Sequence, residues 1–174
     1  MPTIVIPFRG DDSKQRLPAP VRVHLAREML ADVLAAALEI GSAVLATEGA
    51  QGAAVESALR DVGELPVLVV NADLPAVTPR DLLALLGSIP PDGVAVAAAP
   101  DGTTNELGLA SPSLFRPVYG PGSAERSFAL GLSRLVEIPN LAADVDTLDD
   151  LRGLEERLGP NTAAALDELA APAR

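Results

Sequence analysis

Residues 65–86 read LPVLVVNADLPAVTPRDLLALL and hold, in direct succession, an apolar run, an acidic turn and a leucine-rich segment. The run Val67–Val70 is short, β-branched and unbroken, which is typical of a strand buried on both faces in a parallel sheet. Asp73 follows this run, and the pair Thr78 and Pro79 is typical of a helix N-cap and first turn. The stretch therefore predicts a strand, a turn and a crossover helix of an α/β fold.

Asp73 stands at the position where open α/β sheets bind their ligands, just beyond the carboxyl end of a strand. A carboxylate at that edge can hold a metal ion, and it can equally do no more than cap a turn. Both interpretations of Asp73 stay open on this segment alone.

The rest of the chain repeats the alternation of apolar runs and helical patterns. We expect further strands at residues 3–6, 43–46, 93–98, 107–110 and 135–138, and helices at residues 21–40, 51–62, 124–132, 148–158 and 162–174. This order predicts a three-layer α/β sandwich around a mostly parallel sheet with crossover helices. The 174 residues contain no linker or internal repeat, so we expect a single domain over residues 1–174.

The composition excludes several classes of protein. Aromatic residues make up only 2% of the chain and the net charge is −11, which argues against nucleic acid and membrane surfaces as partners. There is no cysteine, and the single His24 cannot form a histidine-rich metal site. No apolar run is long enough for a membrane span and no signal-peptide pattern is visible, so we expect a cytoplasmic protein.

The polar loop after the first strand concentrates positive charge in an acidic chain. Lys14 is the only lysine of the protein, and Arg9 and Arg16 flank it. Cations beside a sheet edge can neutralise a polyphosphate, whereas the alternative is a solvated surface loop. The position of the loop after the first strand favours the phosphate-binding interpretation.

Three further polar segments follow apolar runs. Thr104 and Asn105 carry groups that form turns and that also bind phosphate or ribose oxygens. The turn GPGS at residues 120–123 precedes a predicted helix, and free N–H groups at a helix start bind anions, although such a turn alone is a weak signal. Asp144 and Asp146 lie before another predicted helix, where we expect one carboxylate to face a site and the other to anchor the turn.

Together these segments form a coherent chemical set. Carboxylates, water and substrate phosphates suit Mg²⁺ rather than a cage made only of protein ligands. Phosphoryl or nucleotidyl transfer needs positioning and charge neutralisation more than a side-chain nucleophile, which agrees with the lack of cysteine. We therefore expect the segments to meet along one edge of the sheet.

The motifs SKQRL, ADLP, GTTNEL, YGPGS and DVDTLDDL occur in the order in which they occur in a known family. Over residues 4–158 the chain resembles the 2-phospho-L-lactate and phosphoenolpyruvate guanylyltransferases of coenzyme F-420 biosynthesis. The resemblance implies the GT-A-like, Rossmann-type nucleotidyltransferase fold. It also implies the joining of GTP to phosphoenolpyruvate or 2-phospho-L-lactate with release of pyrophosphate.

The resemblance also implies roles for individual residues. Mg²⁺ would be held by Asp73 and by the pair Asp144 and Asp146, with Asp73 and Lys14 as the catalytic residues. The substrate-binding residues would be Arg9, Arg16, Thr104, Asn105, Gly120, Gly122 and Ser123. The chain departs from the expected pattern at three places: the acidic pair Asp11 and Asp12 in the Lys14 loop, Asn71, and Glu106, which follows Asn105. These departures leave the base specificity open.

Two other functions stay open at this point. One is a nucleotidyltransferase with a molybdopterin or sugar-phosphate acceptor, although the loop GGxSxRMG expected of the former is missing after the first strand. The other is a nucleotide-binding module without turnover. The choice between phosphoenolpyruvate and 2-phospho-L-lactate also stays open, as does the oligomeric state, for which a homodimer is one expectation.

Overall fold

The computed structural model describes residues 1–10, 16–63, 65–99, 102, 104–117 and 133–170. Its strands are β1 (Thr3–Pro7), β2 (Ser42–Ala46), β3 (Val67–Val70), β4 (Val94–Ala98), β5 (Thr104–Leu109) and β6 (Ser133–Val136). Its α-helices are α1 (Ala19–Ile40), α2 (Gln51–Arg60), α3 (Pro79–Gly87), α5 (Leu148–Gly153) and α6 (Pro160–Ala170). Short 3₁₀ helices lie at Pro112–Leu114 and Glu155–Arg157.

The six strands form one sheet in the order β2-β1-β3-β5-β4-β6. β1 is parallel to β2 and β3, and β4 is parallel to β6. β5 is antiparallel to both of its neighbours, so its first residues lie at the edge where β3 and β4 end. The prediction of a mostly parallel α/β sheet is confirmed, with β5 as the exception.

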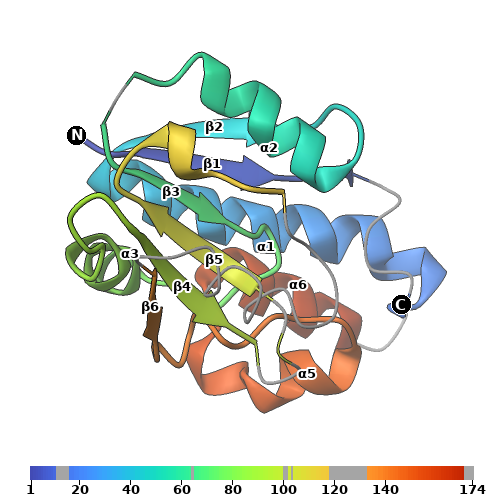
Figure 1. Cartoon of the computed structure of the whole chain (residues 1–174). Helices are drawn as coiled ribbons and strands as arrows, with labels where there is room; N and C mark the ends of the chain where they lie inside the picture. Colours follow the sequence, from blue (N-terminus) through green and yellow to red (C-terminus); the bar gives the residue numbers. More distant parts are fainter. Residues whose placement is uncertain (11–15, 64, 100–101, 103, 118–132, 171–174) are drawn as a thin grey trace.

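Helices cover both faces of the sheet, with α2 on one face and α1 and α3 on the other (Figure 1). Alternate strand residues divide accordingly, because successive side chains of a strand point to opposite faces. Ile4 and Ile6 of β1 pack against α1, whereas Val5 packs in the cluster with α2. A third cluster joins α1 to α5 and α6.

Local signals explain where the central elements begin. Thr78 caps α3, because its side chain accepts from the N–H of Asp81, and the Asp81 carboxylate accepts from the N–H of Thr78. Such a reciprocal capping box satisfies donors that the first helical turn leaves without partners. The Thr78 cap and the strand Val67–Val70 are therefore confirmed.

Several predicted boundaries were wrong. β5 begins at Thr104 rather than residue 107, because Thr104 pairs with Ala98 of β4 instead of forming a turn. The helix predicted for residues 148–158 ends at Gly153 and continues as a 3₁₀ turn, since glycine is a weak helix former. The predicted helix at residues 124–132 lies outside the described residues.

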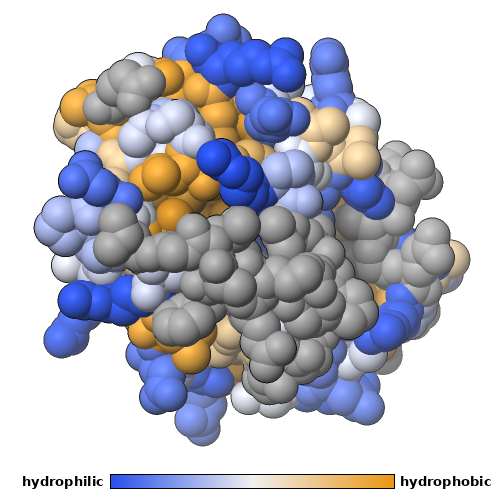
Figure 2. All heavy atoms as spheres, viewed as in Figure 1, coloured by the Kyte–Doolittle hydropathy of each residue, from blue (hydrophilic) through white to orange (hydrophobic). Residues whose placement is uncertain are grey.

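The face shown in Figure 2 is hydrophilic along much of its rim, and hydrophobic side chains are exposed within it. Among the described residues, the helices include none that combines the length and the apolar character needed to cross a bilayer.

Candidate active site

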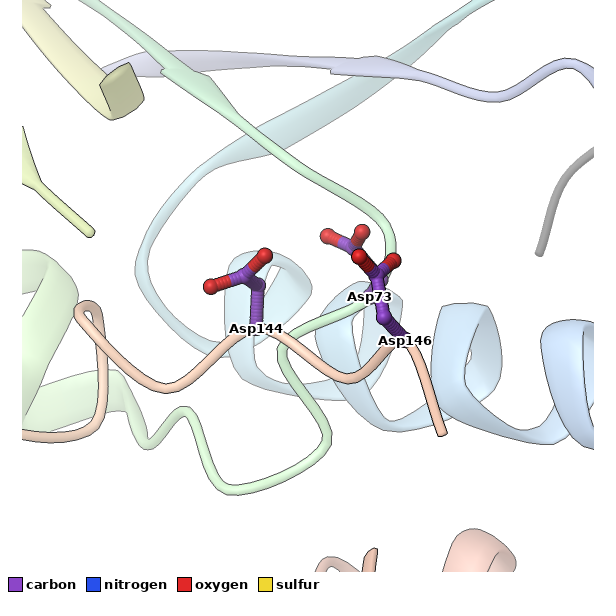
Figure 3. Close-up of side chains that lie close together, drawn as sticks. All are labelled: Asp73, Asp144 and Asp146. Atoms are coloured by element: carbon purple, nitrogen blue, oxygen red, sulfur yellow. The ribbon is translucent and has the colours of Figure 1, made fainter. Parts of the chain in front are cut away.

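Three carboxylates converge at the carboxyl end of β3. Oxygen atoms of Asp73, Asp144 and Asp146 all lie within 4.8 Å of one another, and each residue is half-buried (Figure 3). Asp73 follows β3, whereas the other two come from the segment that precedes α5. The N–H of Val145 donates to the carbonyl of Asp73 at 3.0 Å, which holds the two segments side by side.

Asp144 and Asp146 both face Asp73 (Figure 3). The expectation that one of the pair would face the site while the other anchored the turn was wrong. Residues two apart on an extended segment project from the same side, and the intervening Val145 is fully buried in the cluster with α1. The turn is anchored instead by Asp150, whose Oδ2 accepts from the N–H groups of Asp146 and Thr147.

The three carboxylates suit a small divalent cation. Opposite ligands of an octahedral Mg²⁺ with bonds of about 2.1 Å stand about 4.2 Å apart. The oxygens are spread over no more than 4.8 Å, so small side-chain movements bring them within the reach of one ion. Hard carboxylate oxygens are also the ligands that Mg²⁺ prefers. The structure brings the three predicted carboxylates together, and their role as cation ligands stays a prediction.

A fourth carboxyl group, that of Glu106, is close enough to Asp73 and Asp144 for their charges to act on it, and it was missed as a site residue. Glu106 sits in β5 opposite Val70, and only 1% of its surface is exposed. Burial raises the pKa of Glu106 well above its ordinary value of 4.5, and the charges of Asp73 and Asp144 raise it further. The available signal was an acidic residue directly before the apolar run of residues 107–110.

Two cavities border the carboxylate cluster. A cavity of about 150 Å³ lies between the ends of β1 and β3, and Asp73 is part of its wall. A larger cavity of about 550 Å³ includes Asp144 and Asp146 in its lining. The acidic cluster therefore lies at the boundary between two spaces, an arrangement that allows two ligands to meet beside one cation.

Each cavity contains one arginine that the sequence analysis singled out. Arg9 is exposed and lines the smaller cavity. Arg16 lines the larger cavity, and its Nη1 donates to Oδ2 of Asp146 at 3.0 Å. Lys14 of the same loop lies outside the described residues.

The predicted hydroxyl and amide ligands are only partly described. Thr104 begins β5 and is buried. It pairs with Ala98 of β4, whereas Glu106 pairs with the preceding Ala97, so Thr104 and Glu106 lie on opposite faces of the sheet. The side chain of Asn105 lies outside what the structure describes. The candidate anion turn with Gly120, Gly122 and Ser123 lies outside the described residues.

The smaller cavity also contains two hydrogen-bonded amide side chains, Gln51 and Asn71, whose pairing was not predicted from the sequence. Nε2 of Gln51, at the start of α2, donates to Oδ1 of Asn71 at 3.0 Å. Pro7, Phe8, Ala26, Met29 and Ala72 supply apolar lining to the same cavity. An amide pair beside an apolar wall can both hydrogen-bond and pack against a flat heterocycle.

Comparison with known proteins places these residues in a family. The chain is 34% identical over 164 residues to a phosphoenolpyruvate guanylyltransferase from Rhodococcus opacus, with 87% of this chain and 68% of that protein covered. It is 32% identical over 191 residues to a 2-phospho-L-lactate guanylyltransferase from Natrialba magadii, with 85% of this chain and 80% of that protein covered. The chain belongs to this guanylyltransferase family. No protein-family model matches it.

Other members of the guanylyltransferase family are matched over less of their length. A phosphoenolpyruvate guanylyltransferase from Streptomyces scabiei is 40% identical over 119 residues, which cover 66% of this chain and 55% of that protein. The chain thus spans about half the length of several curated family members that it matches.

Solved structures agree with the fold of this guanylyltransferase family member. A candidate nucleotide-diphospho-sugar transferase from Desulfovibrio desulfuricans superposes with a TM-score of 0.70 at 17% identity, covering 97% of this chain and 94% of that one. The 2-C-methyl-D-erythritol 4-phosphate cytidylyltransferase from Thermus thermophilus gives a TM-score of 0.54 at 18% identity, covering 98% and 100%. The prediction of a nucleotidyltransferase fold is confirmed.

Proposed function

We propose that this chain transfers the guanylyl group of GTP to the phosphate of phosphoenolpyruvate or 2-phospho-L-lactate. An oxygen of the acceptor phosphate forms a bond to the α-phosphorus of GTP, the bond from that phosphorus to the α–β bridging oxygen breaks, and pyrophosphate leaves. The observation that carries the proposal is the position of three carboxylates between two cavities. The names of the relatives support the choice of substrates.

The two cavities suggest where each substrate binds. The smaller one offers Gln51 and Asn71 beside an apolar wall, which suits a nucleobase, and Arg9 at its edge suits a phosphate. The larger one has Arg16 beside the acidic cluster and suits the phosphorylated acceptor. Lys14 is proposed to contact a phosphate of GTP.

The remaining acceptor ligands are proposed from the family motifs. Thr104 and Asn105 supply side-chain groups, and the turn with Gly120, Gly122 and Ser123 supplies backbone N–H groups to the acceptor phosphate. Gly122 permits the close approach of backbone to phosphate that a Cβ would obstruct.

Mg²⁺ is the proposed cofactor, with Asp73, Asp144 and Asp146 as its protein ligands. A bound divalent cation would neutralise the charge that develops on the transferred phosphoryl group and on pyrophosphate. The carboxylates orient the phosphates only in its presence, because their own charge repels a phosphate. We further propose that residues 1–174 act as one domain in the cytoplasm, and the homodimer stays a prediction.

The test is a direct product assay. The purified chain is incubated with GTP and Mg²⁺ plus either acceptor, and both pyrophosphate and the mass of the product are measured. We expect pyrophosphate to appear only with an acceptor, together with a guanylylated product. ATP and CTP as donors, and molybdopterin or a sugar phosphate as acceptors, serve as controls.

Two outcomes would contradict the proposal. Turnover with a sugar phosphate but not with either three-carbon acceptor would assign another transferase activity. Binding of GTP with no pyrophosphate under any condition would instead make the chain a nucleotide-binding module.

A further inference from the structure

Glu106 is the buried acidic residue of the site to which the proposed reaction assigns no role. It lies in the middle of β5, paired with Val70 of β3 and Ala97 of β4, and it is 1% exposed. Neither oxygen of its carboxyl group has a hydrogen-bond partner among the described residues. A carboxyl group in such a position destabilises the fold unless a further polar or charged group compensates it.

The residues around Glu106 show on which side a polar or charged partner for its carboxyl group would lie. Val70 and Ala97 belong to the apolar cluster beneath the sheet, so the strands beside Glu106 offer it no polar partner. The next residue of β5 on the same face is Gly108, where a Cβ would lie only 2.8 Å from Ile89 Cγ1. This apolar packing on that side leaves the edge with the carboxylate cluster as the polar side of Glu106.

Among the described residues, the charges that shift the pKa of Glu106 are negative. Burial raises this pKa, and the charges of Asp73 and Asp144 raise it further. Repulsion among carboxylates at such a site is relieved when a cation is present, since the cation attracts every one of them. A single bound cation would thus stabilise both the three converging carboxylates and the buried Glu106.

We propose that Glu106 adds its charge to the cation site of Asp73, Asp144 and Asp146, so that the protein binds a divalent cation without nucleotide. Glu106 acts as a positioning and charge-supplying residue and is not itself a reacting group. The inference rests on the cation site of the proposed function, but it does not depend on either substrate.

The test measures Mn²⁺ binding to the full chain alone, with no nucleotide or acceptor. Bound Mn²⁺ is measured by electron paramagnetic resonance and by calorimetry at 25 °C, on wild type and on variants whose folding is verified by circular dichroism. We expect Glu106→Gln, which keeps the size of the side chain, to weaken the Kd for Mn²⁺ about tenfold or more. Glu56→Gln is the matched control, because Glu56 is exposed on α2 on the other side of the sheet, and we expect less than a twofold change.

Thermal unfolding provides a second measurement, in which Mn²⁺ is expected to reverse or reduce the difference in Tm between the variant and the wild type. Without metal, Glu106→Gln is expected to melt at or above the wild-type temperature, because a buried carboxyl group is removed. Added Mn²⁺ should raise the Tm of the wild type more than that of the variant, since a ligand stabilises the state that binds it. Glu106→Leu, which suits the apolar neighbours Val70 and Ala97, serves if the glutamine variant does not fold.

The outcomes separate this inference from the proposed function. If the folded variant binds Mn²⁺ as tightly as wild type, the role of Glu106 is refuted even when guanylyl transfer is observed. If Mn²⁺ binding depends on Glu106 but no pyrophosphate is released with any acceptor, the inference stands and the proposed function fails.

Discussion

Arg16 and Asp146 form an ion pair, Nη1 to Oδ2 at 3.0 Å, across 130 residues of sequence. Their side chains are 75% and 43% exposed, so the pair contributes at most about 1 kcal/mol to stability. Its significance is positional, because it sets a guanidinium beside the carboxylate cluster at the wall of the larger cavity.

Replacing Arg16 is therefore expected to affect catalysis and not folding. Arg16→Ala should change the free energy of unfolding by less than about 0.5 kcal/mol. It should lower kcat/KM at least about tenfold, which is about 1.4 kcal/mol of transition-state stabilisation. Steady-state kinetics and urea unfolding measure the two effects. Arg152→Ala, which breaks the exposed pair with Asp149, is the control, and equal activity losses in both variants would argue against a specific role of Arg16.

Each carboxylate of the cluster is expected to be required for turnover. Asp73→Asn, Asp144→Asn and Asp146→Asn should each lower pyrophosphate release at least about 100-fold, because loss of one anionic ligand weakens the hold on the cation. The exposed Asp149→Asn is the control. Full activity in the Asp144 or Asp146 variant would show that only one member of the pair serves the site, and circular dichroism would verify that each variant is folded.

Because the pKa of Glu106 is raised in the folded state, we expect the stability of the metal-free protein to depend on pH. The folded pKa of Glu106 lies above its unfolded value, so between the two the native state keeps a proton that the unfolded state releases. This contribution is fully present below pH 4.5 and is lost as the pH rises through the folded pKa. Urea unfolding in EDTA from pH 4 to pH 8 should show the wild type losing stability relative to Glu106→Gln. A difference that stays constant with pH would contradict the prediction.

Asp32 is expected to be a structural residue that connects α1 to α6. Its buried carboxylate accepts from the backbone N–H groups of Asn161 and Thr162 at 3.0 and 2.9 Å, at the start of α6. Asp32→Ala leaves these donors without a partner and should lower the free energy of unfolding by about 2–3 kcal/mol. Denaturant unfolding measures the loss. Glu39→Ala, on the exposed side of the same helix, should cost less than about 0.5 kcal/mol, and similar losses in both would refute the capping role.

The amino-acid sequence by itself determined the class of the fold and the members of the acidic cluster. The run Val67–Val70, the Thr78 cap and the position of Asp73 are local signals, since strand burial, capping and turn formation depend on neighbouring residues. The resemblance in ordered motifs identified the family, which the relatives confirm.

Only the tertiary structure decided how distant segments meet. The antiparallel insertion of β5 between β3 and β4 places Glu106 close enough to Asp73 for its charge to act, and no local pattern sets the direction or register of a strand within its sheet. The pairing of Arg16 with Asp146 depends in the same way on the packing of segments far apart in sequence. Residue types and periodicity define which elements form, whereas strand order and register define which side chains share a site.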